Sequence, residues 1–278
     1  MDHQTEPTTR DLLWDGSVEV LCFGAATGDW ALRGMTPEEN ERHNPGIVGR
    51  LRALFDRHRV GRLYLPSPGR FNGELARPEE LGVSWMDGLM FRGAYAEGVT
   101  LGKIGEAVGI ASSDCPTIIA RNARSLLAVA AHAGRESLYD LADLSSGHPA
   151  RKHASVVDAI VEALAADGPT DGISAHVTCG IGPMAFEHRL DDPAHGDRNR
   201  RLRAYVTERW GAQCAGDRWF SLGAIISAQF RAKGVPNERI SHRHDCTYSH
   251  KDGSRPRWNS HRRDRDGKRN FVLAIRRK

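Results

Sequence analysis

The sequence predicts a single α/β domain with a mixed sheet, and three observations lead to that prediction. Strand-like and helix-like segments alternate along the chain. No tandem repeat, low-complexity tract or obvious linker divides it. Its 278 residues, 40% hydrophobic and 27% charged, are enough for one large core. We expect residues 1–16 to be a flexible N-terminal segment and residues 17–278 to form the domain.

The first half of the chain contains mostly strand patterns. Residues 17–23 (SVEVLCF) are β-branched and apolar, and Gly24 closes them. A helix is predicted after Asn44-Pro45, because the apolar residues that follow recur at helical spacing. Further strands are predicted at residues 62–65, 88–92, 100–110, 117–120 and 125–132.

The second half contains the clearest helices. Residues 154–168 are amphipathic and end at Gly168, and residues 197–211 and 221–235 also have helical patterns. Residues 173–183 (ISAHVTCGIGP) are predicted as a strand that runs into a Gly-Pro turn, and further strands are predicted at 239–249 and 269–277.

Several protein classes are excluded. The polar N-terminus resembles neither a signal peptide nor a transit peptide, and no stretch approaches the roughly 18 to 20 apolar residues of a membrane helix. A cytoplasmic location, with no membrane partner, is therefore the default expectation. The five cysteines are scattered without a C-x-x-C pair, which argues against a disulfide framework or a zinc ribbon.

The C-terminal segment 239–278 is strongly basic. It contains thirteen Lys/Arg and four Asp/Glu, whereas the whole chain has a net charge of only +4. Such a segment can bind an anionic molecule, or it can simply be a solvated, charge-rich end. Nucleic acid is an improbable partner, because nothing here matches a known nucleic-acid-binding motif.

Two residues of chemical interest stand at the ends of predicted strands. Cys115, preceded by Asp114, follows one apolar run, and His132 ends the next. Strand ends of an α/β domain commonly meet at a shared edge, where sites form. From spacing alone, the two are metal ligands, a nucleophile and its base, or two core residues.

A resemblance favours a functional role. The segments SDCPTIIA, LLAVAAHAG, CGIGPMAFEH, DCTYS and WNSHRRDRDGKRNFVLAI occur in the order seen in the laccase-domain family, also called multicopper polyphenol oxidases. The similarity is collinear over nearly the whole chain, from about Val18 to Ile275. It implies a three-layer α/β/α fold with a mixed sheet, similar to that of certain cysteine-dependent deamidases.

The resemblance also implies an activity and a cofactor. Family members act on purine nucleosides, by phosphorolysis or deamination, at a zinc (in older accounts copper) held by two histidines and one cysteine. The cysteine and the second histidine correspond to Cys115 and His132. Thiolate and imidazole suit Zn²⁺, and a three-ligand site leaves one position open for water or substrate. Phosphate would then be a co-substrate.

The sequence departs from the family pattern at two places. The expected first histidine is replaced by Pro68, which has no donor atom on its side chain. The family's Trp-Arg pair after His-Ala-Gly is replaced by Arg135-Glu136. A complete zinc site would then need a third ligand from elsewhere, and the alternative is that this chain binds no metal.

Two further interpretations stay open for that reason. Cys115 can act as a thiolate nucleophile with His132 as its base, in a metal-independent hydrolase, amidase or cyclase. Alternatively, the chain is a non-catalytic, ligand-binding descendant. Asp114 is a candidate third member of the catalytic group, oriented toward a neighbouring backbone or side-chain group.

The remaining candidates bind substrate or an anion. Guanidinium groups suit phosphate and carboxylate, and the candidates are Arg135, Arg262, Arg263 and Arg269, with Gly180 shaping a tight loop at the pocket rim. The histidines around Cys246 form an H-x-H-x-C-x-x-x-H pattern that lacks a standard zinc spacing, so we predict no metal site there.

Overall fold

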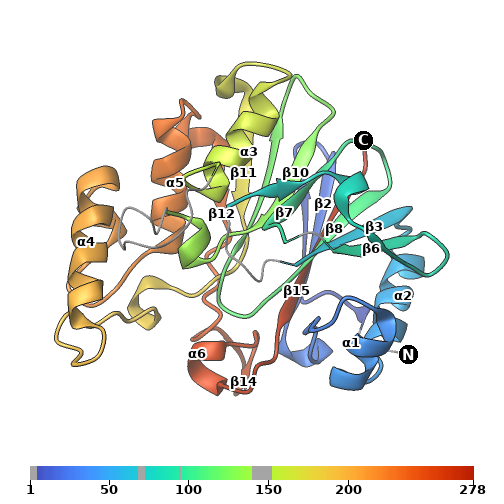
Figure 1. Cartoon of the computed structure of the whole chain (residues 1–278), viewed down its shortest axis with the longest axis horizontal. Helices are drawn as coiled ribbons and strands as arrows, with labels where there is room; N and C mark the ends of the chain where they lie inside the picture. Colours follow the sequence, from blue (N-terminus) through green and yellow to red (C-terminus); the bar gives the residue numbers. More distant parts are fainter. Residues whose placement is uncertain (1–4, 68–72, 94, 140–151) are drawn as a thin grey trace.

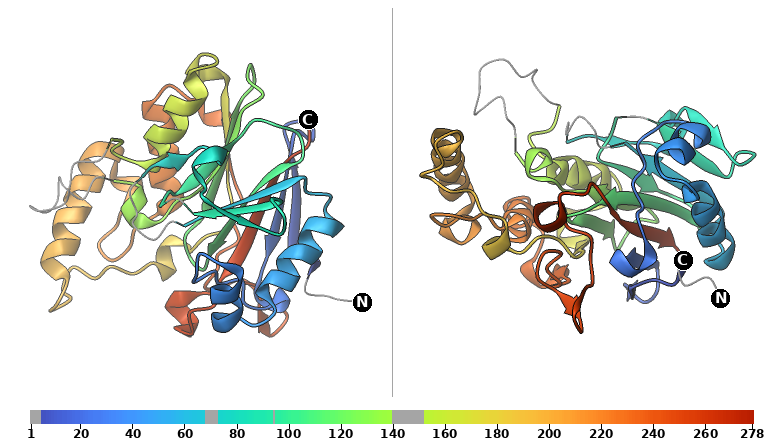
Figure 2. Two further views of the ribbon diagram at one scale, coloured as in Figure 1. Left: turned by 45° about the vertical axis from the view of Figure 1, so that its right-hand side comes forward. Right: turned by 90° about the horizontal axis from the view of Figure 1, so that it is seen from below.

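Two β-sheets lie face to face between two layers of helices (Figure 1). The computed structural model describes residues 5–67, 73–93, 95–139 and 152–278. Helices α1 and α2 lie on one outer side, and α3, α4 and α5 lie on the other, as the two views of Figure 2 also show. The predicted α/β class is confirmed, and two stacked mixed sheets form the layer between the helices.

The first sheet has seven strands in the order β1-β2-β15-β8-β3-β6-β5. Only β8/β3 and β3/β6 are parallel, so the sheet is mixed. The last strand of the chain, β15, lies between β2 and β8. The strands span Thr9–Leu13 (β1), Val18–Phe23 (β2), Asn270–Arg276 (β15), Glu106–Ser112 (β8), Arg62–Pro66 (β3), Met90–Gly93 (β6) and Val83–Trp85 (β5).

The second sheet has six strands in the order β12-β11-β9-β10-β7-β4. Its central pairs, β11/β9, β9/β10 and β10/β7, are antiparallel, and both edge pairs are parallel. The strands span Ile240–His242 (β12), Ile173–Val177 (β11), Thr117–Asn122 (β9), Ala128–His132 (β10), Gly98–Leu101 (β7) and Leu75–Ala76 (β4). A separate ribbon pairs Lys251–Asp252 (β13) with Arg255–Pro256 (β14).

Helices α1, α3, α5 and α6 begin at polar caps that the sequence supplies. Thr36 and Glu39 form a capping box at the start of α1, and Ser155 and Ser221 cap α3 and α5. The helices span Pro37–His43 (α1), Ile47–Arg57 (α2), Val156–Ala165 (α3), Gly196–Trp210 (α4), Leu222–Ala232 (α5) and His261–Asp264 (α6).

Three apolar clusters hold the layers together. One packs α3, α4 and α5 on the six-stranded sheet, and another packs α2 on the seven-stranded sheet. The third fills the space between the sheets, with Val20, Val108 and Val272 on one side and Val99 and Ala130 on the other. Because every strand in the middle of a sheet is covered on both faces, these strands read as continuous apolar runs rather than alternating ones.

The two ends of the chain are both tied into the fold. Within the N-terminal segment, Thr9–Leu13 form the edge strand β1, which pairs with β2. In the basic C-terminal segment, Arg243 binds Asp11 and Arg277 binds Glu19. These ion pairs join elements far apart in the sequence and neutralise part of the basic charge.

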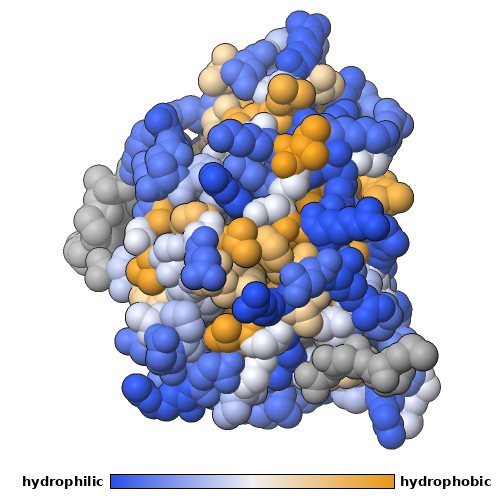
Figure 3. Space-filling model, turned by 90° about the vertical axis from the view of Figure 1, so that its right-hand side faces the viewer, coloured by the Kyte–Doolittle hydropathy of each residue, from blue (hydrophilic) through white to orange (hydrophobic). Residues whose placement is uncertain are grey.

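The surface alternates between small apolar areas and charged ones. On the face shown in Figure 3, apolar atoms gather near the centre and hydrophilic side chains surround them. Within the described ranges, no helix has the length and apolar character needed to cross a membrane.

Candidate active site

Cys115 lies in the short connection where the chain passes from one sheet to the other. Strand β8 ends at Ser112, and β9 begins at Thr117. The Ser112 hydroxyl donates a hydrogen bond to the Cys115 carbonyl (2.8 Å), and the Ala133 N–H donates to the Pro116 carbonyl (2.9 Å). The turn is therefore fixed at both ends, and its cysteine side chain is half-buried.

His132 is the last residue of β10 and stands opposite Thr117 in the β9/β10 pair. A Cβ atom on Gly134 would lie 3.4 Å from Cys115 Sγ and 3.3 Å from His132 Nε2, so both atoms face this glycine. The same Cβ would lie 2.7 Å from His132 Cε1, which only a glycine avoids. The imidazole and the Cys115 sulfur are hydrogen-bonded to each other.

A buried carboxylate holds the other side of the imidazole. Glu97 is fully buried, and its Oε2 lies 2.8 Å from His132 Nδ1. The backbone N–H of His132 also donates to the backbone carbonyl of Glu97 (2.8 Å), because Glu97 precedes β7, the strand paired with β10. Glu97, His132 and Cys115 thus form a hydrogen-bonded line. This is the arrangement by which a carboxylate fixes the tautomer and orientation of a catalytic histidine.

The charges of this line support one another. Burial disfavours the imidazolium. The negative charge of Cys115, the hydrogen bonds that the ring donates to Cys115 and Glu97, and the Glu97 carboxylate charge outweigh this effect and raise the pKa of His132 to about 10. Glu97 Oε1 has no hydrogen-bond partner among the residues that the structure describes. A buried carboxylate in that state needs a nearby positive charge, and the His132 imidazolium provides it.

Asp114 and Gly180 position the cysteine turn. The Asp114 carboxylate accepts hydrogen bonds from the Thr247 hydroxyl and from the Arg262 N–H, both at 2.8 Å. A Cβ on Gly180 would lie 3.0 Å from the Pro116 ring, so the CGIGP loop can approach the turn only with glycine at this position. Both residues therefore act by holding neighbouring segments in place.

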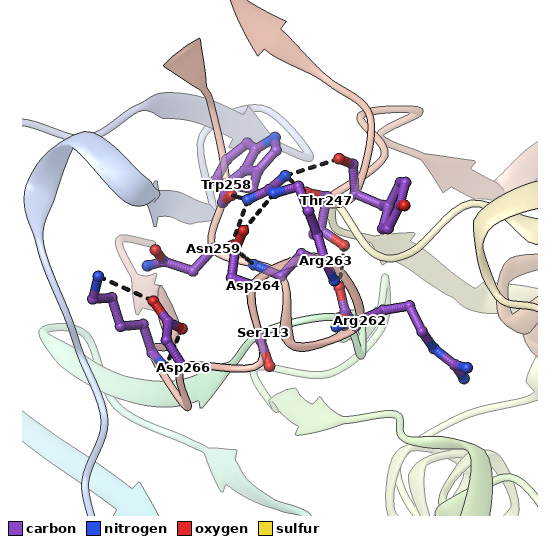
Figure 4. A network of polar contacts seen from close by, with 12 residues as sticks. Ser113, Thr247, Trp258, Asn259, Arg262, Arg263, Asp264 and Asp266 are labelled. Carbon is purple, nitrogen blue, oxygen red and sulfur yellow. Dashed lines mark hydrogen bonds and ion pairs between the residues drawn. The ribbon is translucent and has the colours of Figure 1, made fainter.

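The predicted anion-binding arginines separate into two kinds. Arg263 donates to the carbonyls of Tyr248 (2.8 Å) and Trp258 (2.7 Å) and pairs with Asp264, so it holds the C-terminal loop together (Figure 4). Arg269 donates to the Ser113 hydroxyl at 3.0 Å, two residues before Cys115.

Arg262 behaves differently, since its side chain extends away from this network (Figure 4). Together with Arg135 it lines a cavity of about 310 Å³.

Comparison with known proteins identifies the relatives of this site. The family model described as multi-copper polyphenol oxidoreductase laccase matches residues 92–276. The chain belongs to the laccase-domain family. The matched range contains Glu97, Cys115, His132 and Asp114. A comparison with curated protein sequences gives no match.

Solved structures with a similar fold superpose on nearly the whole length of this chain. Neisseria meningitidis protein NMB0706 superposes with a TM-score of 0.66 at 16% identity, covering 98% of this chain and 100% of its own. The Bacillus licheniformis hypothetical protein YfiH superposes with a TM-score of 0.65 at 13% sequence identity, covering 93% of this chain and 92% of its own. YlmD from Geobacillus stearothermophilus superposes with a TM-score of 0.62 at 18% identity, covering 94% of this chain and 92% of its own. Identities this low establish the shared fold alone.

The name of the laccase-domain family implies a metal, but the described donors of this chain do not form a metal site. Cys115 and His132 offer two donor atoms, and no group of three His, Cys, Asp or Glu side chains within the described ranges could hold an ion. Pro68, at the expected histidine position, lies outside the described residues. We therefore derive no chemical step through a metal.

Glu97 is the functional residue that the sequence did not reveal in this laccase domain. It is one of 35 acidic residues, and it lies 35 positions before the histidine that it orients. One local signal is present, since Glu97 directly precedes the buried strand Gly98–Leu101 and is itself buried. An acidic residue at the start of a buried strand needs a partner, but the sequence does not say which.

Proposed function

We propose that the chain is a small-molecule enzyme in which Cys115 is the nucleophile, His132 the general acid and base, and Glu97 the residue that positions His132. The hydrogen-bonded line from Glu97 through His132 to Cys115 is the observation that carries this proposal. A thiolate beside an imidazolium is a strong nucleophile at neutral pH and needs no metal. The substrate has an electrophilic carbon, of which an amide carbonyl is the simplest case.

The reaction on an amide proceeds in two balanced halves. The Cys115 sulfur bonds to the carbonyl carbon, and the π electrons of the C–O bond move to the oxygen. When the C–N bond breaks, His132 gives its proton to the leaving nitrogen, and a thioester remains. Water then attacks the thioester and gives a proton to His132, and the thiolate leaves as the carboxylic acid forms. An amine or hydroxyl of the substrate in place of water would give a cyclised product.

On this proposal, backbone N–H groups beside the sulfur stabilise the developing oxyanion. Gly134 faces Cys115 Sγ and His132 Nε2, and we assign the N–H groups of Cys115 and Gly134 to this role. Two such donors in a partly enclosed site stabilise negative charge without reorganisation.

The direct test is to trap the covalent intermediate. The purified protein is mixed with a panel of small amides and esters, quenched in acid and weighed intact by mass spectrometry. We expect an added mass on the wild type, located on Cys115 by peptide mapping, and none on the Cys115→Ala variant. A protein that turns over a substrate while Cys115→Ala retains full activity would contradict the thiol mechanism.

The second candidate is the purine-nucleoside activity that the resemblance implies. Membership of the laccase-domain family favours it, as does the cavity lined by Arg135 and Arg262, because phosphorolysis requires a phosphate subsite. On this proposal the site acts on a nucleoside, with phosphate or water as co-substrate. The cytoplasmic location expected from the sequence belongs to both proposals.

Two measurements separate the candidates. Adenosine, inosine, guanosine and methylthioadenosine are assayed with and without Zn²⁺ and phosphate, next to the amide panel. Elemental analysis then measures zinc per chain in the wild type and in Cys115→Ala and His132→Ala. Stoichiometric zinc that both variants lose supports the nucleoside enzyme, whereas a metal-free active protein supports the thiol enzyme. Unchanged biological effect in both variants would indicate a binding protein without catalysis.

A further inference from the structure

A buried arginine of the seven-stranded sheet lacks a carboxylate partner. Arg92, in β6, is 4% exposed. Its Nε donates a hydrogen bond to the Gly34 carbonyl, and its Nη2 donates to the Leu32 carbonyl at 3.2 Å. Among the described residues, none accepts a hydrogen bond from Nη1, and none forms an ion pair with this guanidinium. Burial lowers the pKa of Arg92 to about 10, so the group is still protonated at neutral pH. A buried cation in that state destabilises the fold until an anion neutralises it.

Arg92 lines a cavity of about 390 Å³, which we call the Arg92 cavity. Two kinds of side chain dominate its lining. The first kind carries a guanidinium group and comprises Arg33, Arg42 and Arg92. The second kind presents apolar surface and comprises Leu32, Met35 and the ring of Tyr95. The cavity therefore offers both positive charge and an apolar surface to a ligand.

The positive charge of the Arg92 cavity exceeds its negative charge. Glu39 is the one carboxylate among the described residues that line the cavity. Its Oε2 accepts the backbone N–H groups of Met35 (2.7 Å) and Thr36 (3.1 Å) at the start of α1, and the charge of Arg42 acts on it as well. A single carboxylate thus faces three guanidinium groups and is already bound to two backbone donors, so a net positive charge remains.

The segment that leads into α1 is held in place by the protein itself. The Asn40 side-chain oxygen accepts the backbone N–H groups of Arg33 (2.9 Å) and Gly34 (3.1 Å). The Trp85 indole N–H donates to the Met35 carbonyl at 2.8 Å. A ligand therefore meets a preformed site and does not have to order this segment.

The Arg92 cavity is separate from Cys115 and His132. Side chains two residues apart on a strand share a face, and Met90 belongs to the cluster that packs α2 on the seven-stranded sheet. Arg92 therefore lies on the outer face of that sheet, on the side of α1 and α2 (Figure 1). Cys115 precedes β9 and His132 ends β10, which are strands of the other sheet. An inference about this cavity goes beyond the proposed function and does not rest on it.

The size and lining of the cavity define what it can bind. A volume of about 390 Å³ lies within the range of small-molecule sites. Guanidinium groups match the oxygens of a carboxylate, and a neutral molecule would leave Arg92 without a counter-ion. A small inorganic anion would leave the apolar part of the lining uncovered. An anion with an apolar body satisfies both parts.

We propose that the Arg92 cavity binds a small organic acid, whose carboxylate neutralises Arg92 and whose apolar body lies against Leu32 and Met35. Arg33 and Arg42 add the charge that attracts the anion, and the Tyr95 ring covers its apolar body. Such a ligand stabilises the folded chain, because it supplies the counter-ion that the buried guanidinium lacks.

Calorimetric titration of the full chain at low ionic strength tests the proposal. Benzoate is the probe, since it joins a carboxylate to an apolar ring. Benzamide has the same shape without the charge, and acetate and orthophosphate have charge without the ring. Each is titrated as a competitor of benzoate, so that binding elsewhere on the chain is not counted. We expect one benzoate per chain, no competition by benzamide, and competition by acetate and orthophosphate that is at least about tenfold weaker.

Variants locate the bound benzoate. Arg42→Gln removes an exposed guanidinium of the cavity, and Arg52→Gln, at an exposed position of α2 outside the described lining, is the matched control. We expect the dissociation constant of benzoate to rise about threefold in Arg42→Gln and to stay the same in Arg52→Gln. Arg92→Gln should raise it at least about tenfold, and circular dichroism checks that this variant folds.

Several results would overturn the proposal. They are a wild type that does not bind benzoate, competition by benzamide, and orthophosphate that competes as strongly as benzoate binds. Equal dissociation constants in Arg42→Gln and Arg52→Gln, or a folded Arg92→Gln variant that binds benzoate like the wild type, would do the same. If Arg92→Gln does not fold, the competitors and the comparison of Arg42→Gln with Arg52→Gln decide the matter.

Discussion

Two clusters of cysteine and histidine stand out among the described residues, and in only one of them do a thiol, an imidazole and a buried carboxylate contact one another in sequence. Cys115 and His132, which we call the reactive pair, share a hydrogen bond, and Glu97 holds the far side of the imidazole. The second cluster consists of His242, the last residue of β12, with His244 and Cys246 after it. The difference between the clusters lies in what each ring nitrogen and each sulfur contacts.

In the second cluster the thiol and the imidazoles have separate partners. His242 Nε2 lies 2.7 Å from the Ser227 hydroxyl, and its ring stacks on His244 with centroids 6.2 Å apart. Cys246 Sγ accepts the Gly182 N–H at 3.1 Å. Burial and then the charge of His244 lower the pKa of His242, whereas the pKa of His132 is raised. The Cys115 sulfur that faces the ring, and then the buried Glu97 carboxylate behind it, thus distinguish the His132 imidazole from that of His242.

The largest expected effect distinguishes the two cysteines. Replacing the nucleophile, in Cys115→Ser, should lower turnover by at least about 10³-fold, since a serine beside the same histidine is a far weaker nucleophile. Cys246→Ser is the matched control and should leave turnover within about twofold. Steady-state kinetics on any substrate found in the panels measures both. Equal losses in the two variants would remove the distinction between the clusters.

The next effect concerns the carboxylate. Glu97→Gln keeps the shape of the side chain but removes its charge and presents an amide donor to Nδ1, which disfavours the tautomer and the imidazolium that the mechanism needs. We expect turnover and the rate of iodoacetamide labelling at Cys115 to fall by about 10²- to 10⁴-fold. Glu97→Asp should recover part of the loss.

Glu106→Gln controls for removal of a buried carboxylate, because Glu106 accepts hydrogen bonds from the Tyr64 hydroxyl and from the backbone N–H groups of Gly102 and Lys103 in the connection before β8, away from the reactive pair. If the labelling rate has the same pH profile in Glu97→Gln as in the wild type, Glu97 contributes to packing and does not position His132.

A third prediction concerns protonation. Because the pKa of His132 is raised from 6.5 to about 10, the folded protein holds a proton there that the unfolded chain loses above pH 6.5. The stabilisation that this proton gives the folded state is complete below pH 6.5, and it is lost as the pH rises toward about 10. His242 has the opposite effect on stability. Its pKa is lowered in the folded protein, so protonation of this residue in the unfolded chain below pH 6.5 opposes folding.

Nitrogen NMR of the imidazoles at pH 7.5 measures this difference directly. His132 should have both ring nitrogens protonated, and His242 only one. The assignment comes from the spectra of His132→Gln and His242→Gln. A neutral His132 at pH 7.5 would mean that the reactive pair is no ion pair, although the line of hydrogen bonds would remain.

The smallest expected effect completes the comparison. His242→Gln should change the rate of iodoacetamide labelling at Cys246 by less than about twofold, because the hydrogen bonds to Cys246 Sγ come from the Ser249 hydroxyl and backbone N–H groups. The pKa of this thiol is lowered by those bonds against the opposing effect of burial. A large fall in His242→Gln would show a second thiol–imidazole pair.

The fold was largely predictable because its elements are long and strongly patterned. The strands β2, β8, β9, β10, β11 and β15 and the helices α2 to α5 all fall within or next to the predicted segments. The elements that escaped prediction are short or lie at an edge. Strands β4 and β5 have two and three residues, and α6 has four, too few for any periodicity to show.

The candidate site was predictable in part. Strand ends correctly indicated that Cys115 and His132 come together, because β9 and β10 are neighbours in sequence and pair directly. Glu97 could not be found in this way, since its contact with His132 depends on β7 pairing with β10 in one particular register. The division of the arginines into structural and pocket-lining ones likewise depends on loops whose path no local pattern fixes.

The position of β15 has a consequence for how the protein is made. This strand, Asn270–Arg276, comes after every strand of the six-stranded sheet in the chain, yet it lies in the middle of the seven-stranded sheet between β2 and β8. Until it has left the ribosome, β2 and β8 have no common neighbour and the apolar space between the sheets stays open. The seven-stranded sheet therefore closes only after this strand has been synthesised, and a nascent chain that lacks it is a natural client for chaperones that shield unpaired strand edges.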